Sequence, residues 1–250
     1  MSNFQPQNIK SRVTQGLAED YFSLMQECPF VRLNEFIQLK NFAKLKSPQK
    51  ILDVPTEGIL MRNLYPDVSI DQADWVVSDV IFQKYMHKET DFKFKNLHSD
   101  HYDAVLGIVP IHHANDMEKS HYLSHSHRVL KSSSVLAFGE VEKGSESDLF
   151  LDEFVHLNSA NGHQGAYIDQ SFNAEIAAHG FSEVASEFRS CPWVFESWSQ
   201  LIYFFTKFFG LNPMEDEDLI NQVKQYLSIE ERANKMIVEW GLRYFRAIKT

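Results

Sequence analysis

Short apolar runs, each followed by polar residues and then by apolar residues at helical spacing, recur along much of the chain. An unbroken apolar run is typical of a strand that is buried on both faces of a sheet. Because these runs alternate with helical patterns, they predict a doubly wound, mostly parallel α/β sheet of seven strands. The predicted strands are Lys50–Val54, Val68–Asp71, Phe92–Phe94, Tyr102–Val109, Ser134–Val141, Glu183–Arg189 and Tyr244–Ile248.

Helical periodicity flanks the predicted sheet at both ends. From Thr14 to Lys46, apolar residues recur every three or four positions, which predicts a helical N-terminal cap. Two more helices are predicted at Ser197–Phe209 and Glu215–Glu239, separated by Gly210–Pro213. We expect one domain with a cap at 14–46, an α/β core at 47–190, a helical lid insert at 197–239 and the last strand at 240–250.

Charge and composition exclude several classes of function. The chain of 250 residues has 24 Lys and Arg against 34 Asp and Glu, a formal net charge of −10. A protein of that sign repels polyanions, so nucleic acid is not an expected partner. The first residues are polar and no run of eighteen apolar residues occurs, so we expect a cytoplasmic protein with no membrane partner. Cys28 and Cys191 are too few for a disulfide framework and are expected to be buried thiols.

Two segments near the start of the predicted core resemble the class I S-adenosylmethionine (SAM) methyltransferases. Ile51–Val54 is similar to the first strand of that family, which ends in an acidic residue, here Asp53. Asp71 follows 18 residues later, where the family places the acidic residue that binds the ribose hydroxyls. Asp91 is similar in position to the acidic residue that contacts adenine.

Two later segments extend the resemblance as far as Phe181. Tyr102–Val105 is similar to the family's fourth strand. Arg128–Leu136 is similar to a helix end, a turn and the fifth strand, with Ser132–Ser134 in the place where Pro-Gly-Gly usually stands. The resemblance implies a Rossmann-like methyltransferase fold, SAM as the cofactor and a small, hydrophobic metabolite as the substrate. It leaves a homodimer open.

The loop after the first predicted strand departs from the family pattern. Where the family has Gly-x-Gly-x-Gly, this chain has Pro55, Thr56, Glu57, Gly58 and Ile59. Glycine allows a positive φ and a close approach of the cofactor to the backbone, whereas Pro55 fixes φ and lacks an N–H group. Glu57 would lie near the methionyl end of SAM, where it can repel the carboxylate or pair with the amino group.

Two hypotheses follow from that loop. In the first, the protein is a methyltransferase whose cofactor-binding residues include Pro55, Glu57 and Gly58, together with Asp53 and Asp71. In the second, the fold no longer transfers methyl groups and instead binds another ligand, catalyses a different reaction or regulates a partner protein.

His112 and His113 follow the fourth-strand segment, at the edge where open α/β sheets bind ligands. An imidazole with an ordinary pKa of about 6.5 can serve there as a general base that takes a proton from the methyl acceptor. The alternative is structural, because the family often carries a histidine here that caps the following turn. Glu140 and Glu142 alternate along the next predicted strand and so share one face, where they are expected either at the pocket or, as the alternative, solvated or in an ion pair.

Substrate contacts are expected from the cap, from a loop and from the lid. The residues are Tyr21 in the cap, His163 and Tyr167 before the last core helix, and Trp193 and Phe195 beside the lid. Aromatic side chains commonly line apolar ligand pockets. For the aromatic residues of the lid, packing onto the sheet is the alternative.

Eleven histidines raise the question of a metal site. His121 and His125 lie one helical turn apart, and His98–His101 form a second group. Neither group is accompanied by a third recognisable ligand motif. We therefore predict no metal site and expect these histidines to be solvated at the surface.

Overall fold

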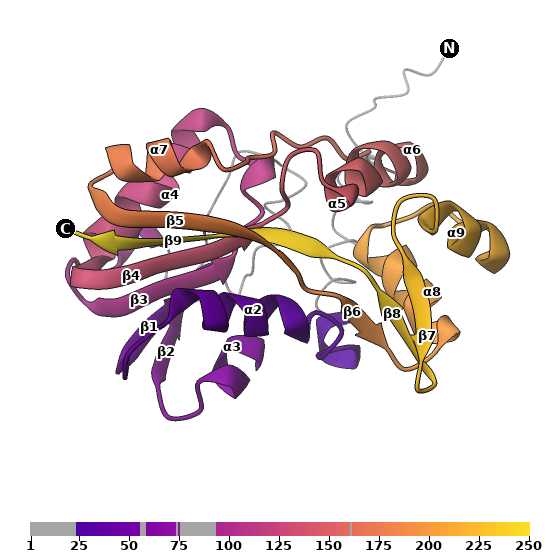
Figure 1. The fold of residues 1–250 in the computed structure, drawn as a ribbon, viewed down its shortest axis with the longest axis horizontal. Coiled ribbons are helices and arrows are strands. Elements are labelled where there is room, and N and C mark those ends of the chain that lie inside the picture. Colours follow the sequence, from indigo (N-terminus) through magenta and orange to yellow (C-terminus); the bar gives the residue numbers. More distant parts are fainter. Residues whose placement is uncertain (1–23, 56–58, 74, 76–93, 161) are drawn as a thin grey trace, which may run out of the picture.

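A mixed β-sheet forms the centre of the protein and carries helices on both faces (Figure 1). The computed structural model describes residues 24–55, 59–73, 75, 94–160 and 162–250. Within these residues the central sheet has six strands in the order β2-β1-β3-β4-β9-β5. Its strands are β1 (Lys50–Asp53), β2 (Ser69–Gln72), β3 (Tyr102–Ile108), β4 (Leu130–Glu140), β5 (Phe181–Ser190) and β9 (Gly241–Lys249).

The apolar runs of the sequence form the middle of this sheet. β1, β3 and β4 are adjacent and parallel, and β2 pairs in parallel with β1. β9 lies antiparallel between β4 and β5. From Ala104 to Ile108, every side chain of β3 is buried, as expected of a strand covered on both faces. The predicted doubly wound, mostly parallel α/β fold is confirmed.

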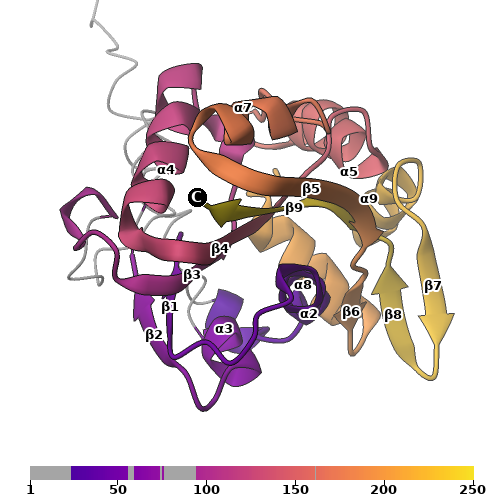
Figure 2. The same cartoon turned by 60° about the vertical axis from the view of Figure 1, so that its left-hand side comes forward.

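Helices cover the sheet in two layers (Figure 2). One apolar cluster packs α2 and α3 against Ile51 and Leu106, and the other packs α4 and α7 against Leu52 and Val105. Neighbouring strand residues point to opposite faces, which is why the two clusters alternate along each strand. The helices are α2 (Leu33–Ala43), α3 (Ile59–Leu64), α4 (Asp116–Val129), α5 (Glu146–Leu149), α6 (His156–Asn158), α7 (Phe172–Ala178), α8 (Trp198–Phe208) and α9 (Asp216–Val223), with the 3₁₀ turns η2 (Phe94–Asn96) and η3 (Ile111–His113) and the π-helix η4 (Phe150–Val155).

The strand predicted at Phe92–Phe94 is not part of the described sheet. Residues 92 and 93 lie outside the described residues, and Phe94 begins the 3₁₀ turn η2. The carbonyl groups of Phe94 and Leu97 accept hydrogen bonds from the guanidinium of Arg128. A side chain, rather than a neighbouring strand, therefore satisfies the backbone of this segment.

Part of the segment predicted to be a helical lid forms a second, three-stranded sheet instead. The helix predicted at Ser197–Phe209 is confirmed as α8, but the one predicted at Glu215–Glu239 ends as α9 at Val223 and is wrong beyond it. The remainder forms a hairpin, because Ala233 and Asn234 both have positive φ, at 52° and 63°. The sheet has the order β6-β8-β7, with β6 (Trp193–Phe195), β7 (Ile229–Arg232) and β8 (Lys235–Val238).

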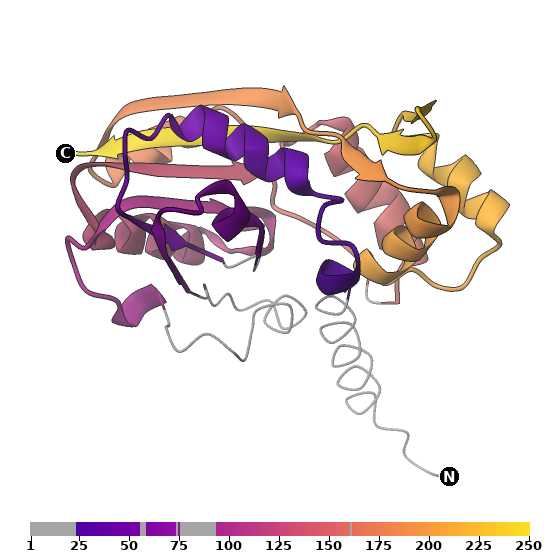
Figure 3. The ribbon, with the colours of Figure 1, turned by 90° about the horizontal axis from the view of Figure 1, so that it is seen from below.

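The second sheet, α8 and α9 lie beyond one end of the central sheet (Figure 3). Figure 1 shows β9 ending at the C-terminus, on the side away from the second sheet. Because β4 runs antiparallel to β9, the carboxyl ends of β4 and its parallel neighbours point toward the second sheet. No helix among the described residues is long and apolar enough to cross a bilayer. Cys28 and Cys191 are buried free thiols, as predicted.

The three serines of the family-like turn form an irregularity within β4. Tyr102 pairs with Leu130 while Ala104 pairs with Val135, so β4 advances five residues where β3 advances two. Ser133 has a φ of 62°, a left-handed conformation that costs a non-glycine residue about 1–2 kcal/mol. Glycine, which the family carries in this turn, would adopt it without that cost.

Replacing Ser133 by glycine should therefore stabilise the protein. We expect Ser133→Gly to raise the free energy of unfolding by about 0.5–1 kcal/mol, because relief of the left-handed strain exceeds the added chain entropy. Ser132, which is equally exposed and does not have a positive φ, is the matched control. Ser132→Gly should lower the same quantity by roughly 0.5–1 kcal/mol in urea unfolding. Equal losses in both variants would contradict the assignment.

Candidate active site

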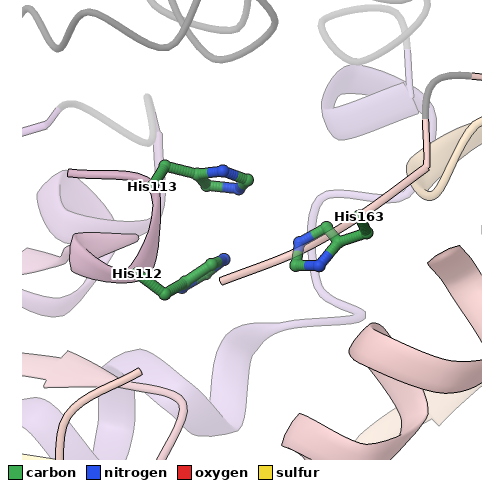
Figure 4. A group of neighbouring side chains, drawn as sticks. All are labelled: His112, His113 and His163. Carbon is green, nitrogen blue, oxygen red and sulfur yellow. The ribbon is translucent and has the colours of Figure 1, made fainter. Parts of the chain in front are cut away.

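Three histidine side chains converge at the carboxyl edge of the central sheet (Figure 4). One ligand nitrogen from each of His112, His113 and His163 lies within 4.8 Å of the others. The ring centroids of His112 and His113 are 4.3 Å apart, and His163 lies 5.3 and 5.1 Å from them. The structure thus joins the two residues predicted to be catalytic to one predicted to contact the substrate.

The junction between β3 and α4 positions His112 and His113. Pro110 ends the strand, and η3 forms a single turn directly after it. The next helix, α4, begins at a capping box in which Asn115 and Glu118 bond to each other's backbone N–H groups. Asn115 provides the side-chain cap of α4, so neither histidine caps this helix.

Glu140, the last residue of β4, holds His112 in place. Its carboxylate accepts the backbone N–H of His112 at 2.9 Å and faces the Nδ1 atom of the same residue at 2.9 Å. It also accepts the N–H of Val141. Burial raises the pKa of the Glu140 carboxyl to about 8, although these backbone donors oppose the rise. With Nδ1 held by Glu140, the Nε2 atom of His112 can accept a proton or bind a cation.

The loop at 162–167 carries His163 into the same site. The carboxylate of Asp152, on η4, accepts the N–H of Gly165 and the hydroxyl of Tyr167, both at 3.1 Å. The Nδ1 atom of His163 lies 3.3 Å from the Tyr167 hydroxyl and 3.6 Å from Asp152. The ring of Tyr167 stacks on His112 with centroids 4.7 Å apart. The two loop residues predicted to contact the substrate therefore lie at the histidine cluster.

Close packing keeps this loop against the histidines. A Cβ atom at Gly165 would lie 2.6 Å from the Tyr167 ring and 3.0 Å from the Cβ of His112. The N–H of Ala166 donates to the carbonyl of His112 at 2.8 Å. Burial and the nearby Asp152 carboxylate raise the pKa of Tyr167 well above its usual range, so its hydroxyl remains a donor.

Asp53 occupies the neighbouring part of the same edge. It is the last residue of β1 and is fully buried. Gln72, its register partner on β2, points to the same face, with its amide nitrogen 3.5 Å from the Asp53 carboxylate. Gln72 in turn accepts a hydrogen bond from Arg62 at 3.0 Å. A buried carboxylate and an amide thus lie side by side where the resemblance implies a cofactor.

Asp71 points to the other face of β2. It pairs in register with Leu52, and its carboxylate binds the Lys50 ammonium and the Tyr102 hydroxyl, both at 2.9 Å. A role of Asp71 in binding the ribose stays a prediction. To bind ribose hydroxyls, the carboxylate would have to keep only part of its contacts with Lys50 and Tyr102 or give them up.

Four of the predicted site residues lie outside the described residues, namely Tyr21, Glu57, Gly58 and Asp91. Pro55 is described and is buried directly after β1, where the resemblance places the first residue of the glycine motif.

Trp193 and Phe195 are in the core of the second sheet. They are 1% and 0% exposed, and the Trp193 indole donates to Glu35 at 2.7 Å. Trp193 stacks on Trp240 with centroids 4.5 Å apart and contacts the aromatic face of α8. This placement fits the packing alternative, and a substrate contact by either residue stays a prediction.

The two histidine pairs considered in the sequence do not form such a cluster. The rings of His121 and His125 are 6.2 Å apart, and those of His98 and His101 are 6.0 Å apart. Neither pair belongs to a group of three metal-ligating side chains within the part of the chain that the structure describes.

Sequence reasoning separated Glu140 from Glu142 only in part and missed Asp152. Glu142 forms an ion pair with Arg243 at 2.6 Å, one of its expected roles, whereas Glu140 faces the ring of His112, and a pocket role of either residue stays a prediction. Asp152 lies in a helical stretch, eleven residues before His163, and no motif links the two. Only the folded chain brings them together.

Removing the Glu140 carboxylate should destabilise the protein. Glu140→Met leaves the buried N–H groups of His112 and Val141 without their acceptor, at about 1–3 kcal/mol for each. We expect the free energy of unfolding in urea to fall by about 3 kcal/mol. Glu187→Met, at an exposed position of β5, is the control and should change it by less than about 0.5 kcal/mol. Similar losses in both variants would show that Glu140 does not support the site.

Comparison by sequence finds no relative. No protein-family model matches the chain, and no curated protein matches it.

Comparison by structure identifies the fold. A SAM-dependent methyltransferase from Archaeoglobus fulgidus matches with a TM-score of 0.53 at 15% identity, over 92% of this chain and 99% of that protein. A SAM-dependent methyltransferase from Thermotoga maritima matches with a TM-score of 0.51 at 12% identity, over 96% and 99%. At such identities a structural match establishes the fold alone: the chain has the class I SAM-dependent methyltransferase fold.

Proposed function

We propose that this protein transfers a methyl group from SAM to a small, hydrophobic metabolite. The observation that carries the proposal is the placement of two polar groups along one edge of the sheet. Asp53 ends β1, and the histidine cluster follows β3, which is the strand paired with β1. Ligands of open α/β sheets bind at this edge. The proposal puts the cofactor at Asp53 and the methyl acceptor at the histidines.

Methyl transfer needs little more than alignment from the protein. The sulfonium of SAM is already activated, so the main contribution is to hold the acceptor in line with the methyl group. Asp53 can pair with the ammonium group of the methionyl end. His112, held by Glu140, and His113 lie on the acceptor side, with the predicted base among them.

The structural relatives agree with a small acceptor. The Thermotoga maritima protein is described as a candidate histamine N-methyltransferase, which is an activity on a small molecule. The second sheet, α8 and α9 lie beyond the same edge (Figure 3), where they would cover that acceptor. We assign residues 197–239 as the lid over this site.

A second candidate function keeps the fold and loses methyl transfer. Pro55 is buried where the family's glycine loop begins, and it cannot supply the backbone freedom of glycine there. In this case the edge binds another ligand, supports a different reaction or serves a partner protein.

Calorimetric titration with SAM separates the two candidates. We expect the wild-type protein to bind SAM with a dissociation constant in the micromolar range. Asp53→Asn should weaken binding by roughly ten- to a hundredfold, because a hydrogen bond to a charged group contributes about 1.5–3 kcal/mol. Asp103→Asn is the matched control. Asp103 accepts a hydrogen bond from the backbone N–H of Gln49, directly before β1, and forms an ion pair with Lys131, both away from the carboxyl edge.

The same titration can favour the second candidate instead. No SAM binding by the wild type, with binding gained in a Pro55→Gly, Glu57→Gly double variant, would show a site that has been lost. Equal weakening by Asp53→Asn and Asp103→Asn would contradict the cofactor position of Asp53.

Amide hydrogen exchange tests the lid. We expect α9 and the β7–β8 hairpin to exchange faster than α4 in the free protein and to slow when S-adenosylhomocysteine and a substrate analogue bind. Exchange that is equally slow in α4 and the lid, with or without ligand, would contradict a gating role.

A further inference from the structure

The histidine cluster has the ligand set of a metal site. Three imidazoles bind Zn²⁺ in catalytic sites and leave further coordination positions for water or substrate. In a tetrahedral site with bonds of about 2.05 Å, ligand nitrogens lie about 3.3 Å apart, so the 4.8 Å limit here requires an approach of at most roughly 1.5 Å. Side-chain rotation of His113 and His163, which are only partly buried, can provide that movement.

Two of the three histidine rings have hydrogen-bond partners of the kind that orient metal-binding histidines. Metal-binding histidines almost always bond their second ring nitrogen to a carboxylate, a carbonyl or water, which fixes the tautomer. His112 presents Nδ1 to Glu140 at 2.9 Å, and His163 presents Nδ1 toward Tyr167 and Asp152 at 3.3 and 3.6 Å. In both residues Nε2 would then be the atom that binds the ion. Hydrogen bonds from neighbouring side chains thus orient two of the three rings.

We infer that His112, His113 and His163 bind one divalent transition-metal ion, such as Zn²⁺, with Glu140 and Asp152 as positioning residues. Imidazole ligands favour zinc, copper, nickel, cobalt or iron over magnesium or calcium, which prefer oxygen. The Asp152 carboxylate, 3.6 Å from the His163 ring, adds a negative charge beside the rings, which favours a cation there. The open side of the ion would face the position of the methyl acceptor.

Such an ion narrows the class of substrate. A divalent cation with free positions binds an anionic oxygen, such as a phenolate, enolate or carboxylate, and lowers the pKa of a coordinated hydroxyl group. The acceptor would then be a hydrophobic metabolite that carries at least one such oxygen. A histidine that ligates the ion is not at the same time the general base, so the ion would replace the predicted base in activating the acceptor.

The inference goes beyond the proposed function and does not depend on it, because the ion needs only residues that fold together without SAM. Metal binding and SAM binding can therefore fail separately. Binding of metal without binding of SAM would support this inference and contradict the proposed function. Binding of SAM without binding of metal would support the proposed function and contradict this inference.

Cobalt(II) titration of the untagged, chelator-treated protein tests the site without any substrate. We expect one Co²⁺ per chain, with intense visible absorption bands typical of a four- or five-coordinate ion with nitrogen ligands. Zn²⁺ should displace the cobalt and abolish the bands. His163→Ala should weaken binding at least tenfold, and Glu140→Gln by about ten- to a hundredfold, as for other carboxylates that orient a ligating histidine.

His121→Ala is the matched control, since His121 and His125 form the alternative pair on α4. It should leave the cobalt spectrum and affinity unchanged. Thermal unfolding of each variant, with and without Zn²⁺, separates a folding defect from a lost ligand, because only a protein with the site gains melting temperature from the ion. A weak octahedral spectrum, or a wild-type affinity retained in His163→Ala, would overturn the inference.

Discussion

The arrangement of the histidine cluster depends on one buried carboxyl group, that of Glu140. Glu140 ends β4 and binds the backbone and ring of His112, which follows β3. The contact thus ties the ends of two parallel strands to each other and to the turn that carries the histidines. The loop at 162–167 then attaches through the carbonyl of His112 and through Asp152. Glu140 therefore orients His112 directly. It supports the loop that carries His163 indirectly, because that loop bonds to the carbonyl of His112.

The parallel core could be predicted from sequence because its signals are local. Tyr102–Val109 and Ser134–Val141 are unbroken apolar runs, and strands of this kind must be buried on both faces. Residues at the ends of such strands meet at one edge, which is why His112 and His113 could be placed there from sequence. His163 and Tyr167 were also placed correctly near that edge, from their position before the last core helix.

Features that depend on distant partners could not be predicted in the same way. The pairing of Asp152 with His163 and the binding of Asp71 by Lys50 and Tyr102 join residues that no sequence period relates. The β7–β8 hairpin was interpreted as a helix. Its two-residue turn consists of Ala233 and Asn234 instead of the usual Asn-Gly pair, and its strands show no clear alternation of apolar and polar residues. The grouping of His163 with His112 and His113 was not predicted because His163 is 50 residues beyond His113.

A crystal structure of the protein grown with S-adenosylhomocysteine and Zn²⁺, with anomalous data at the zinc edge, tests the central claim most directly. That claim is that cofactor and acceptor sites adjoin along one edge of the sheet. We expect an anomalous peak among His112, His113 and His163. The sulfur of S-adenosylhomocysteine should face this peak, and its ammonium group should lie at Asp53. Nucleoside bound elsewhere, or zinc held at surface histidines while the three rings remain uncoordinated, would contradict it.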